Sequence, residues 1–534
     1  MSYRGLTIPF PVGQQGFTGT DNPSQAGPGH FLYVDGAELD GGIIRKEGGA
    51  TKFNGTALEA GAVIISGINW SPVAAAYRDV VFTSTGKILK DTGGGTFSTT
   101  MVSGLSVVRD PPPLFVVGGG EAVGQARKLF MFSSSNQVQI AIGDAATAAA
   151  ISTPPADWTS SFPTFGVVHA FRLWGGGNGS DPHRLYYSTI GNFQDFTGAG
   201  SGTLSVFPGE GDTLAGAVSF RGVLLVFKYP AGIYVVDTRD TSPSNWTVTP
   251  LTRAVGTLNQ HTIIMIENDV LYADVVGSIH ALSTTTEFGD YTSSDIGEAD
   301  KISSFMRLNA NLSKLRRAQG IWYPRKQQAW LSLPLLGSDD NNLRFVTIFE
   351  PSPGGEPLPQ RRFFMSRRDI GVSLWLRPDS AGVPRPAIGD NAGFVWNMDQ
   401  DARNKGGVAY PITFETANTD FGFADQQIAT RAKAGQFLEV SYEPKGNWDL
   451  TVEVFWDDAL TDTILFNMGQ TGSPIGSFIL DTDILSSSAI SSVRQRMAGS
   501  GRRLRLAGQN NGLNQDISLA SFHVGLSLMD ERTG

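Results

Sequence analysis

Short apolar runs separated by turn residues dominate the hydrophobic pattern along this chain. β-Branched and aromatic residues come in small groups, and Gly, Asn, Asp, Ser or Pro interrupts each group. Windows with apolar residues three and four positions apart, typical of amphipathic helices, are scarce. The best helical candidate, residues 483–497, scatters its apolar residues among serines. The pattern therefore predicts an all-β protein with almost no helix.

One strand–turn–strand unit recurs along the chain. Each copy has an apolar strand, a tight turn with Gly or Asn, and a second segment; the turn residues are Gly86, Asn136, Gly191, Gly232 and Gly277. Such turns need positive φ at a central residue, which Gly tolerates best. The separations of 50, 55, 41 and 45 residues match one four-stranded propeller blade per unit. Looser units at 329–349 and 393–396 extend the series. We expect a six- or seven-bladed β-propeller over residues 59–400, with several unrelated β-sandwiches as the alternative.

The segments before and after this region differ from it in composition and in hydrophobic pattern. Residues 1–58 are rich in Pro and Gly, which prevents an independent core, so we expect an extended N-terminal arm with one or two strands. Residues 401–534 begin with a polar linker and continue with strands such as 450–456, where apolar and polar positions alternate. Because such alternation buries one face of a sheet, the sequence predicts a C-terminal β-sandwich or platform domain.

Composition narrows the functional classes. The 534 residues contain no cysteine, which excludes disulfide scaffolds, zinc–thiolate sites and thiol nucleophiles. The balance of 41 basic and 50 acidic residues gives a net charge of −9, which argues against general affinity for nucleic-acid backbones. We see no secretory signal and no apolar run of membrane-spanning length, and expect a soluble protein made in a cytoplasm.

The residues offer little support for catalysis. There is no G-x-S-x-G motif, and the six histidines form no H-x-x-x-H pair. The Gly-rich stretches do not continue into a phosphate-binding loop. Asp399 and Asp401, with nearby Asn397 and Asn404, have calcium-like oxygens but lack the ligand order and terminal Glu of a calcium loop. We predict no catalytic residues, no cofactor and no metal.

Two sets of charged residues remain as candidates. Because some propellers are glycosidases, the acids Asp295, Glu298 and Asp300 are possible catalytic carboxylates, but solvated loop acids are the favoured interpretation. The basic residues gather in two patches, which are candidate contacts with an acidic neighbour or nucleic acid, or else a charged sheet edge that deters aggregation. The first patch, our candidate assembly contact, is Arg494, Arg496, Arg502, Arg503 and Arg505; the second is Arg361, Arg362, Arg367 and Arg368.

Four short segments together resemble a known family. They are residues 33–49 with Gly42-Ile43-Ile44-Arg45, the hairpin at 81–91, the segment 184–196, and the C-terminal runs 414–416, 421–422 and 502–506. In this combination the chain resembles the tail nozzle proteins of short-tailed bacteriophages, also called tail tubular protein B. The resemblance covers most of the chain, although this chain is shorter than many nozzle proteins.

The resemblance implies a structural role in the virion rather than an enzymatic one. Nozzle proteins form a ring, expected to contain six copies, below the portal and the adaptor (head–tail connector) protein, and the genome passes through its lumen without specific binding. Tail fibres or spikes are further expected partners. Six copies at −9 would carry a formal charge of −54, which would let DNA slide along a repulsive wall. The open alternative is a tail adhesin or polysaccharide-degrading enzyme built on a propeller.

Overall fold

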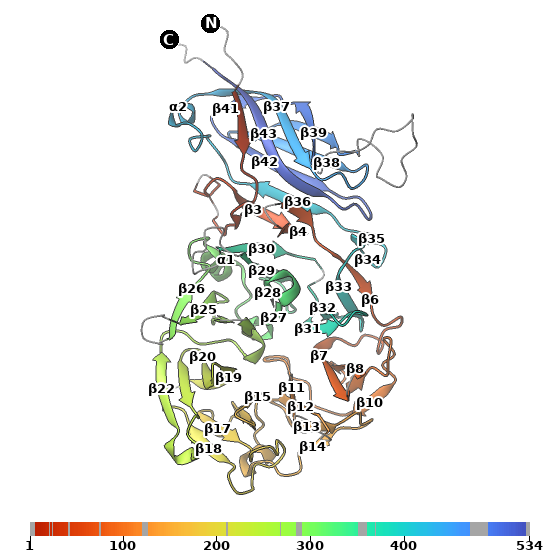
Figure 1. Ribbon diagram of the computed structural model, residues 1–534, viewed down its shortest axis with the longest axis vertical. Coiled ribbons are helices and arrows are strands. Elements are labelled where there is room, and N and C mark those ends of the chain that lie inside the picture. The colour runs from red at the N-terminus through yellow and green to blue at the C-terminus, as the bar shows by residue number, and fades with distance from the viewer. Residues whose placement is uncertain are drawn as a thin grey trace.

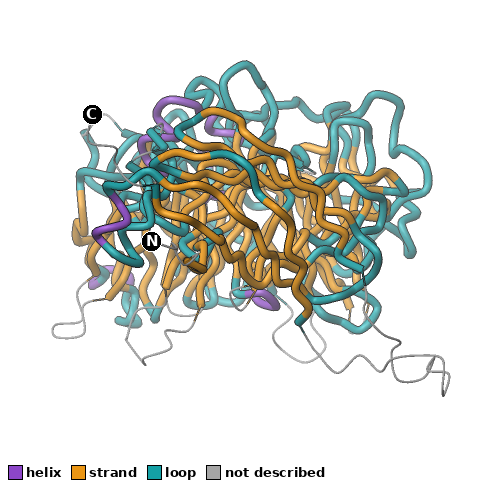
Figure 2. The backbone as a smooth tube through the Cα atoms, turned by 90° about the horizontal axis from the view of Figure 1, so that it is seen from above, coloured by secondary structure: helices purple, strands orange, loops and turns teal. Residues whose placement is uncertain are grey.

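The protein is all-β, as the sequence predicts. The computed structural model describes residues 6–20, 22–23, 25–40, 43–73, 76–119, 126–209, 212–266, 269–284, 291–350, 360–368, 370–469 and 490–529. Strands account for 52% of the structure and helices for 6%. The helices are short, as Figure 2 shows: α1 (Ile302–Asn309), α2 (Gln426–Ala429) and the 3-10 turns η1 (Ala156–Thr159), η2 (Pro243–Asn245), η3 (Gln260–Thr262), η4 (Leu315–Arg317) and η5 (Pro324–Lys326). Most of the weak helical candidate 483–497 lies outside the described residues, and its end forms strand β40 (Ser491–Arg496).

Seven sheets form one half of the molecule. In the first six, the strands follow one another in chain order and neighbours are antiparallel; the seventh also takes in a strand from earlier in the chain and contains one parallel pair. The first four sheets are β7 (Ile64–Val73), β8 (Ala76–Thr83), β9 (Ile88–Lys90), β10 (Thr99–Val102); β11 (Leu114–Gly118), β12 (Lys128–Ser133), β13 (Asn136–Ile142), β14 (Ala149–Ala150); β15 (Phe165–His169), β16 (Arg172–Gly176), β17 (Arg184–Tyr187), β18 (Gly202–Ser205); and β19 (Thr213–Phe220), β20 (Val223–Tyr229), β21 (Ile233–Asp237), β22 (Thr247–Thr252).

The remaining three sheets continue the series. They are β23 (Ile263–Ile266), β24 (Asp269–Ala273), β25 (Ile279–Thr284), β26 (Tyr291–Asp295); β27 (Gln319–Tyr323), β28 (Gln328–Leu333), β29 (Leu343–Glu350), β30 (Gln360–Ser366); and β31 (Ser373–Pro378), β32 (Pro384–Gly389), β33 (Val395–Gln400), followed by β6 (Gly49–Lys52), β34 (Asn404–Lys405) and β35 (Val408–Ala409). The first strands contact one another in sequence order, and β31 contacts β7, so the sheets close into a ring (Figure 1).

Strand β6 completes the last sheet of this ring. It pairs antiparallel with β33, with Trp396 opposite Lys52, and thus ties the N-terminal part of the chain to a strand about 350 residues later. Such long-range pairing holds the first and last sheets together without a covalent bond.

Glycines on the first strands allow neighbouring sheets to approach closely. A Cβ at Gly166 of β15 would lie 2.3 Å from the ring of Phe132, and one at Gly320 of β27 would lie 2.5 Å from Ile264. The space that the missing side chain leaves is filled by a large apolar residue of the preceding sheet. These positions therefore need Gly for packing between sheets rather than for a turn.

Three of the five predicted turn residues lie where the sequence pattern places them. Asn136 does not, because it is the first residue of β13, already pairs with β12 and has no positive φ. Gly86, Gly232 and Gly277 have positive φ and connect the second and third strands of their sheets. Gly191, also at positive φ, instead follows β17 and connects the third and fourth strands of its sheet. The third copy is therefore offset by one strand, because both kinds of hairpin place an apolar strand before a Gly.

Two larger sheets make the other half of the molecule. The strands of the first are β4 (Ala37–Asp40), β5 (Ile43–Lys46), β43 (Ser518–Leu528), β37 (Lys433–Tyr442) and β40, with β1 (Leu6–Phe10) on β43 and β41 (Ser500–Gly501) on β37. The second has β2 (Gly16–Phe17), β3 (His30–Asp35), β36 (Ile412–Thr416), β42 (Leu504–Asn510), β38 (Asp449–Trp456) and β39 (Ala459–Asn467). Alternate residues such as Leu438, Val452 and Val524 are fully buried in a shared apolar core.

The prediction of one or two strands in residues 1–58 needs correction, because six strands lie there. Strands β1 and β5 pair with β43, and β3 pairs with β36. The Pro- and Gly-rich segment has no core of its own, yet its apolar residues fill the core that the C-terminal strands build. Both ends of the chain thus share one pair of sheets.

Candidate assembly surfaces and the junction between the two halves

The first arginine patch divides into an exposed edge and a buried pair. Arg494 and Arg496 lie on β40, which is the edge strand of its sheet. Among the described strands, β40 pairs only with β37. The Arg494 guanidinium stacks 4.0 Å above the ring of Phe437, and its Nε lies 2.9 Å from Glu439 Oε2. With 57% of its side chain exposed, this ion pair stabilises the fold only slightly.

Arg502 and Arg503 continue the same edge beyond β41. Their main-chain N–H groups donate to the Asp457 carboxylate at 3.1 and 2.9 Å, and both side chains are exposed. Buried Lys433 donates to the Arg502 carbonyl at 2.7 Å, which fixes the backbone of this turn. The edge surface, Arg494, Arg496, Arg502 and Arg503, is therefore a row of cations on a fixed backbone.

Arg505 does not belong to this edge. It lies on β42 of the other sheet, with 13% of its side chain exposed, pairs with Glu415 and stacks 4.2 Å from the ring centre of Phe455. Burial lowers the pKa of its guanidinium. The sequence placed the five arginines together because they are near in the chain, whereas the strand that follows Arg503 carries Arg505 into the other sheet.

The second arginine patch divides between the ring and the junction of the two halves. Arg361 pairs with Asp269 at 3.7 Å within the ring. Arg368 Nε donates to Asp35 Oδ2 at 3.1 Å, and the main-chain N–H of Arg367 donates to Asp35 Oδ1 at 2.9 Å. Asp35 ends strand β3, so these contacts join the ring to the paired sheets.

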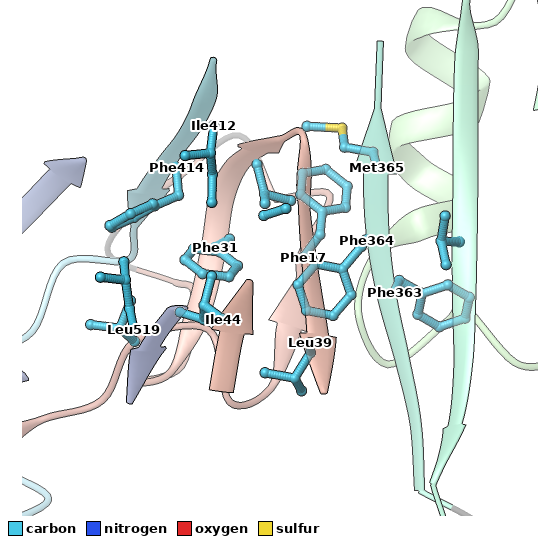
Figure 3. Close-up of a cluster of buried hydrophobic side chains, with 14 of the residues drawn as sticks. Phe17, Phe31, Leu39, Ile44, Phe363, Phe364, Met365, Ile412, Phe414 and Leu519 are labelled. Atoms are coloured by element: carbon cyan, nitrogen blue, oxygen red, sulfur yellow. The ribbon is translucent and has the colours of Figure 1, made fainter. Parts of the chain in front are cut away.

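An apolar cluster forms the centre of this junction. Phe364 and Met365 of β30, the outermost strand of its sheet, point toward residues from β2, β3 and β36, whereas Phe363 points to the other side of β30 (Figure 3). The Phe364 ring is 6.2 Å from Phe31, in an edge-to-face arrangement. All of these side chains are buried, so one continuous core spans the two halves.

Half-buried ion pairs surround that cluster. Lys326 Nζ lies 2.6 Å from Glu38 Oε2 and 2.6 Å from Asp399 Oδ1, and thereby connects η5, β4 and β33. Burial would lower the pKa of Lys326, but the two carboxylates outweigh it and raise that pKa. Tyr323 donates to the second oxygen of Asp399 at 2.6 Å.

Arg344 and Glu47 form the most buried of the ion pairs described at this junction. Arg344 Nη2 lies 3.1 Å from both oxygens of Glu47, and its guanidinium stacks 4.1 Å from the ring centre of Trp330. Burial raises the pKa of the Glu47 carboxyl, although Arg344 opposes the shift. The adjoining cavity measures about 10 Å³ and has room for about one water molecule, so the junction is closely packed.

The loop that carries the candidate catalytic acids Asp295, Glu298 and Asp300 makes contacts within the protein. Asp295 accepts hydrogen bonds from the Gly297 N–H at 2.9 Å and from Ser303 Oγ. The Asp300 side chain faces His30 at 3.3 Å, and its carbonyl accepts from the Gly19 N–H at 2.7 Å. Glu298 is exposed. Two of the three acids therefore hold the loop and dock it onto the N-terminal strands.

Three of the four residues with calcium-like oxygens have partners within the chain, and the fourth, Asp401, is exposed. Asn397 accepts a hydrogen bond from Arg377, Asp399 holds Lys326 and Tyr323, and Asn404 accepts from the Gly407 N–H at 2.7 Å. Among the described residues there is no group of three or more His, Cys, Asp or Glu side chains that could hold a metal ion.

Contacts at one end of the ring cross its axis. The segment before β11 meets the segments before β23 and β27: His261 Nε2 donates to the Pro113 carbonyl at 3.1 Å, and Arg317 Nε lies 2.6 Å from Asp110 Oδ1. Arg109 also pairs with Asp340, which follows β28. Burial lowers the pKa of His261 to about 4, so its ring is neutral at pH 7. Residues 109–113 therefore connect the second sheet with the fifth and sixth sheets across this end of the ring.

The comparisons with known proteins do not identify a family. No family model and no curated protein matches the chain. Among the described residues, no helix is long and apolar enough to cross a membrane.

Similar solved structures include a chain of a mitotic checkpoint complex, which is 14% identical with a TM-score of 0.36 and matches 65% of this chain and 94% of its own length. An exo-β-1,3-galactanase from Phanerochaete chrysosporium with galactose is 10% identical with a TM-score of 0.26 and matches 90% of this chain and 100% of its own length. Likenesses at these TM-scores carry no argument about activity or partners.

Proposed function

We propose that this protein is a structural virion component: the subunit of a tail nozzle ring in a short-tailed bacteriophage. The observation that carries the proposal is the junction, where a shared apolar core and buried and half-buried ion pairs fix a pair of sheets to the rim of the ring. A subunit that conducts a genome under force needs two such modules held as one body. Its location would be the phage tail, after assembly in the host cytoplasm.

We further infer that the ring of sheets is a seven-bladed β-propeller. The cyclic order of contacts among the first strands supports this count, as does the completion of the last sheet by β6. Completion of the last blade by an N-terminal strand also explains why the sequence pattern left the count at six or seven: one strand of that blade is absent from its local segment.

In this proposal, DNA passes between copies of the subunit and not along the propeller axis. Residues 109–113 cross that axis and are held by His261 and Arg317. The lumen would instead be the opening of a ring expected to contain six copies, each with a net charge of −9. Such a wall repels the DNA backbone and favours sliding.

The edge surface is the candidate contact with the adaptor or a neighbouring subunit. Three exposed arginines, Arg496, Arg502 and Arg503, lie beside the Arg494–Glu439 pair. They place positive charge at this edge of a net-acidic protein, which favours pairing with an acidic partner surface. Ring closure by head-to-tail contacts needs two different patches, and this edge would supply one of them.

Charge reversal tests this contact. Replacing Arg502 and Arg503 with Glu should reduce incorporation of the protein into particles, because both side chains are exposed and the turn is held by backbone contacts. Arg239→Glu is the matched control, since Arg239 is 75% exposed on a different sheet connection. A wild-type yield of complete particles from the double variant would reject the edge surface as an assembly contact.

A second assay separates the structural role from the enzymatic one. The purified protein should release no reducing sugar from polysaccharide of the phage's host. Release of sugar by a protein that stays monomeric with its adaptor would overturn the nozzle proposal.

A further inference from the structure

Both nitrogens of the His30 ring face atoms that can only accept hydrogen bonds. Nδ1 lies 3.1 Å from the carbonyl oxygen of Gly27, and Nε2 lies 3.3 Å from Oδ1 of Asp300. A neutral imidazole carries one proton and can donate to only one of them. The protonated ring donates to both and adds a charge opposite to that of Asp300.

The charges around His30 favour the protonated ring. Asp300 is the charged group bonded to it, and the flanking Glu298 and Lys301 are exposed on the same loop. Burial lowers the pKa of His30, but the hydrogen bonds to Asp300 and Gly27 and the negative charge of Asp300 outweigh burial, so the pKa is raised above 6.5.

The same loop holds the N-terminal strands to the ring. The Asp300 carbonyl accepts from the Gly19 N–H at 2.7 Å and from Thr18 Oγ1 at 3.1 Å. The Phe17 ring packs edge-to-face on Phe305 of α1 at 5.5 Å. Gly19 lies so close to the loop that an added Cβ would be 2.4 Å from the Lys301 carbonyl. Asp300 therefore contacts the N-terminal segment through both its side chain and its main chain.

We propose that His30 and Asp300 form a proton-dependent contact that fastens the N-terminal strands to the loop 296–301. The contact is complete when His30 is protonated and loses one hydrogen bond and the charge pairing when the ring becomes neutral. Because the pKa is raised in the docked state, this stabilisation is fully present below pH 6.5 and is lost as the pH rises through the higher docked value. This regulation does not depend on the nozzle proposal.

Hydrogen exchange in the full-length protein tests the contact. Peptides covering residues 16–20 report on the Gly19 N–H, whose acceptor is Asp300. After correction for intrinsic exchange, we expect stronger protection at about pH 5.5 than at about pH 8. His30→Gln and Asp300→Asn, each of which removes the ion pair, should abolish this pH difference. His169→Gln should leave it intact, because His169 contacts Ser219 and Thr238 elsewhere in the ring.

A separate titration guards against unfolded variants. The Cε1–H proton resonance of His30, assigned by its loss in His30→Gln, should titrate above 6.5 and move to lower pH in Asp300→Asn. Protection that is equal at both pH values in the wild type, or a His30 that titrates below 6.5, would overturn the proposal.

Discussion

At the scale of single residues, the buried pair Arg344–Glu47 carries the clearest energetic consequence. Arg344 is 2% exposed, and its guanidinium is the charge that offsets the buried carboxylate of Glu47. Buried ion pairs are costly to form, and removing one partner leaves the other charge without compensation.

Arg344→Ala should therefore lower the free energy of unfolding by about 3–5 kcal/mol at neutral pH. The loss should shrink in acid, because the pKa of Glu47 is raised by burial and a protonated Glu47 needs no counter-charge. Urea unfolding followed by tryptophan fluorescence measures both effects. The double variant Arg344→Met with Glu47→Gln should recover much of the loss; an equal loss in the double variant would contradict the ion-pair explanation.

A glycine between two sheets gives a second test at this scale. Gly166→Ala would place a methyl group 2.3 Å from the buried side chain of Phe132. It should lower the free energy of unfolding of the ring of sheets by about 1–3 kcal/mol through overpacking. Gly55→Ala is the control, because no atom lies within 4 Å of its added Cβ. Thermal unfolding compares the two. Equal melting temperatures would mean that the sheets can move apart at no cost.

At the scale of elements, the N-terminal strands are the structural part that the sequence pattern underestimated. Strand β1 is short and contains Pro9, and it is stable only because it pairs with β43, more than 500 residues later. Local periodicity cannot reveal such a partner. The strands at Val223–Tyr229 and Asp449–Trp456 could be predicted because each carries its own apolar run or alternation.

Strand β1 provides a matched pair of substitutions. Ile8 is 5% exposed and faces the core, whereas neighbouring Thr7 is exposed. Ile8→Lys should destabilise the paired sheets by several kcal/mol, because it buries an unpaired charge, and Thr7→Lys should change stability by less than about 0.5 kcal/mol. Limited proteolysis of the N-terminal segment, alongside thermal unfolding, reports on this region. Equal sensitivity in the two variants would mean that β1 is not held against the core.

The candidate site was predictable only where its residues are neighbours in the sequence. Arg494, Arg496, Arg502 and Arg503 could be grouped because one sheet edge runs through consecutive residues. Arg505 could not be separated from them without knowing that β42 joins the other sheet. The role of Asp300 was hidden because its partners, Gly19 and His30, lie some 270 or more residues earlier in the chain.

At the scale of the whole molecule, the first strand and the last strand lie in the same pair of sheets (Figure 1). Strands β30 and β6 connect the ring to that pair of sheets. Forces on either module pass through the junction, where Phe364 and Lys326 connect the two halves. In the nozzle proposal, this continuous construction suits a subunit that neighbours contact on several sides, and DNA would pass through the space between subunits.

Electron microscopy of the protein mixed with its adaptor, and of purified virions, tests the nozzle proposal most directly. The proposal predicts a closed ring, expected to have six copies, below the adaptor, with a central opening between subunits and with each propeller axis closed. A protein that remains monomeric with its adaptor and is absent from the tail of the virion would contradict it.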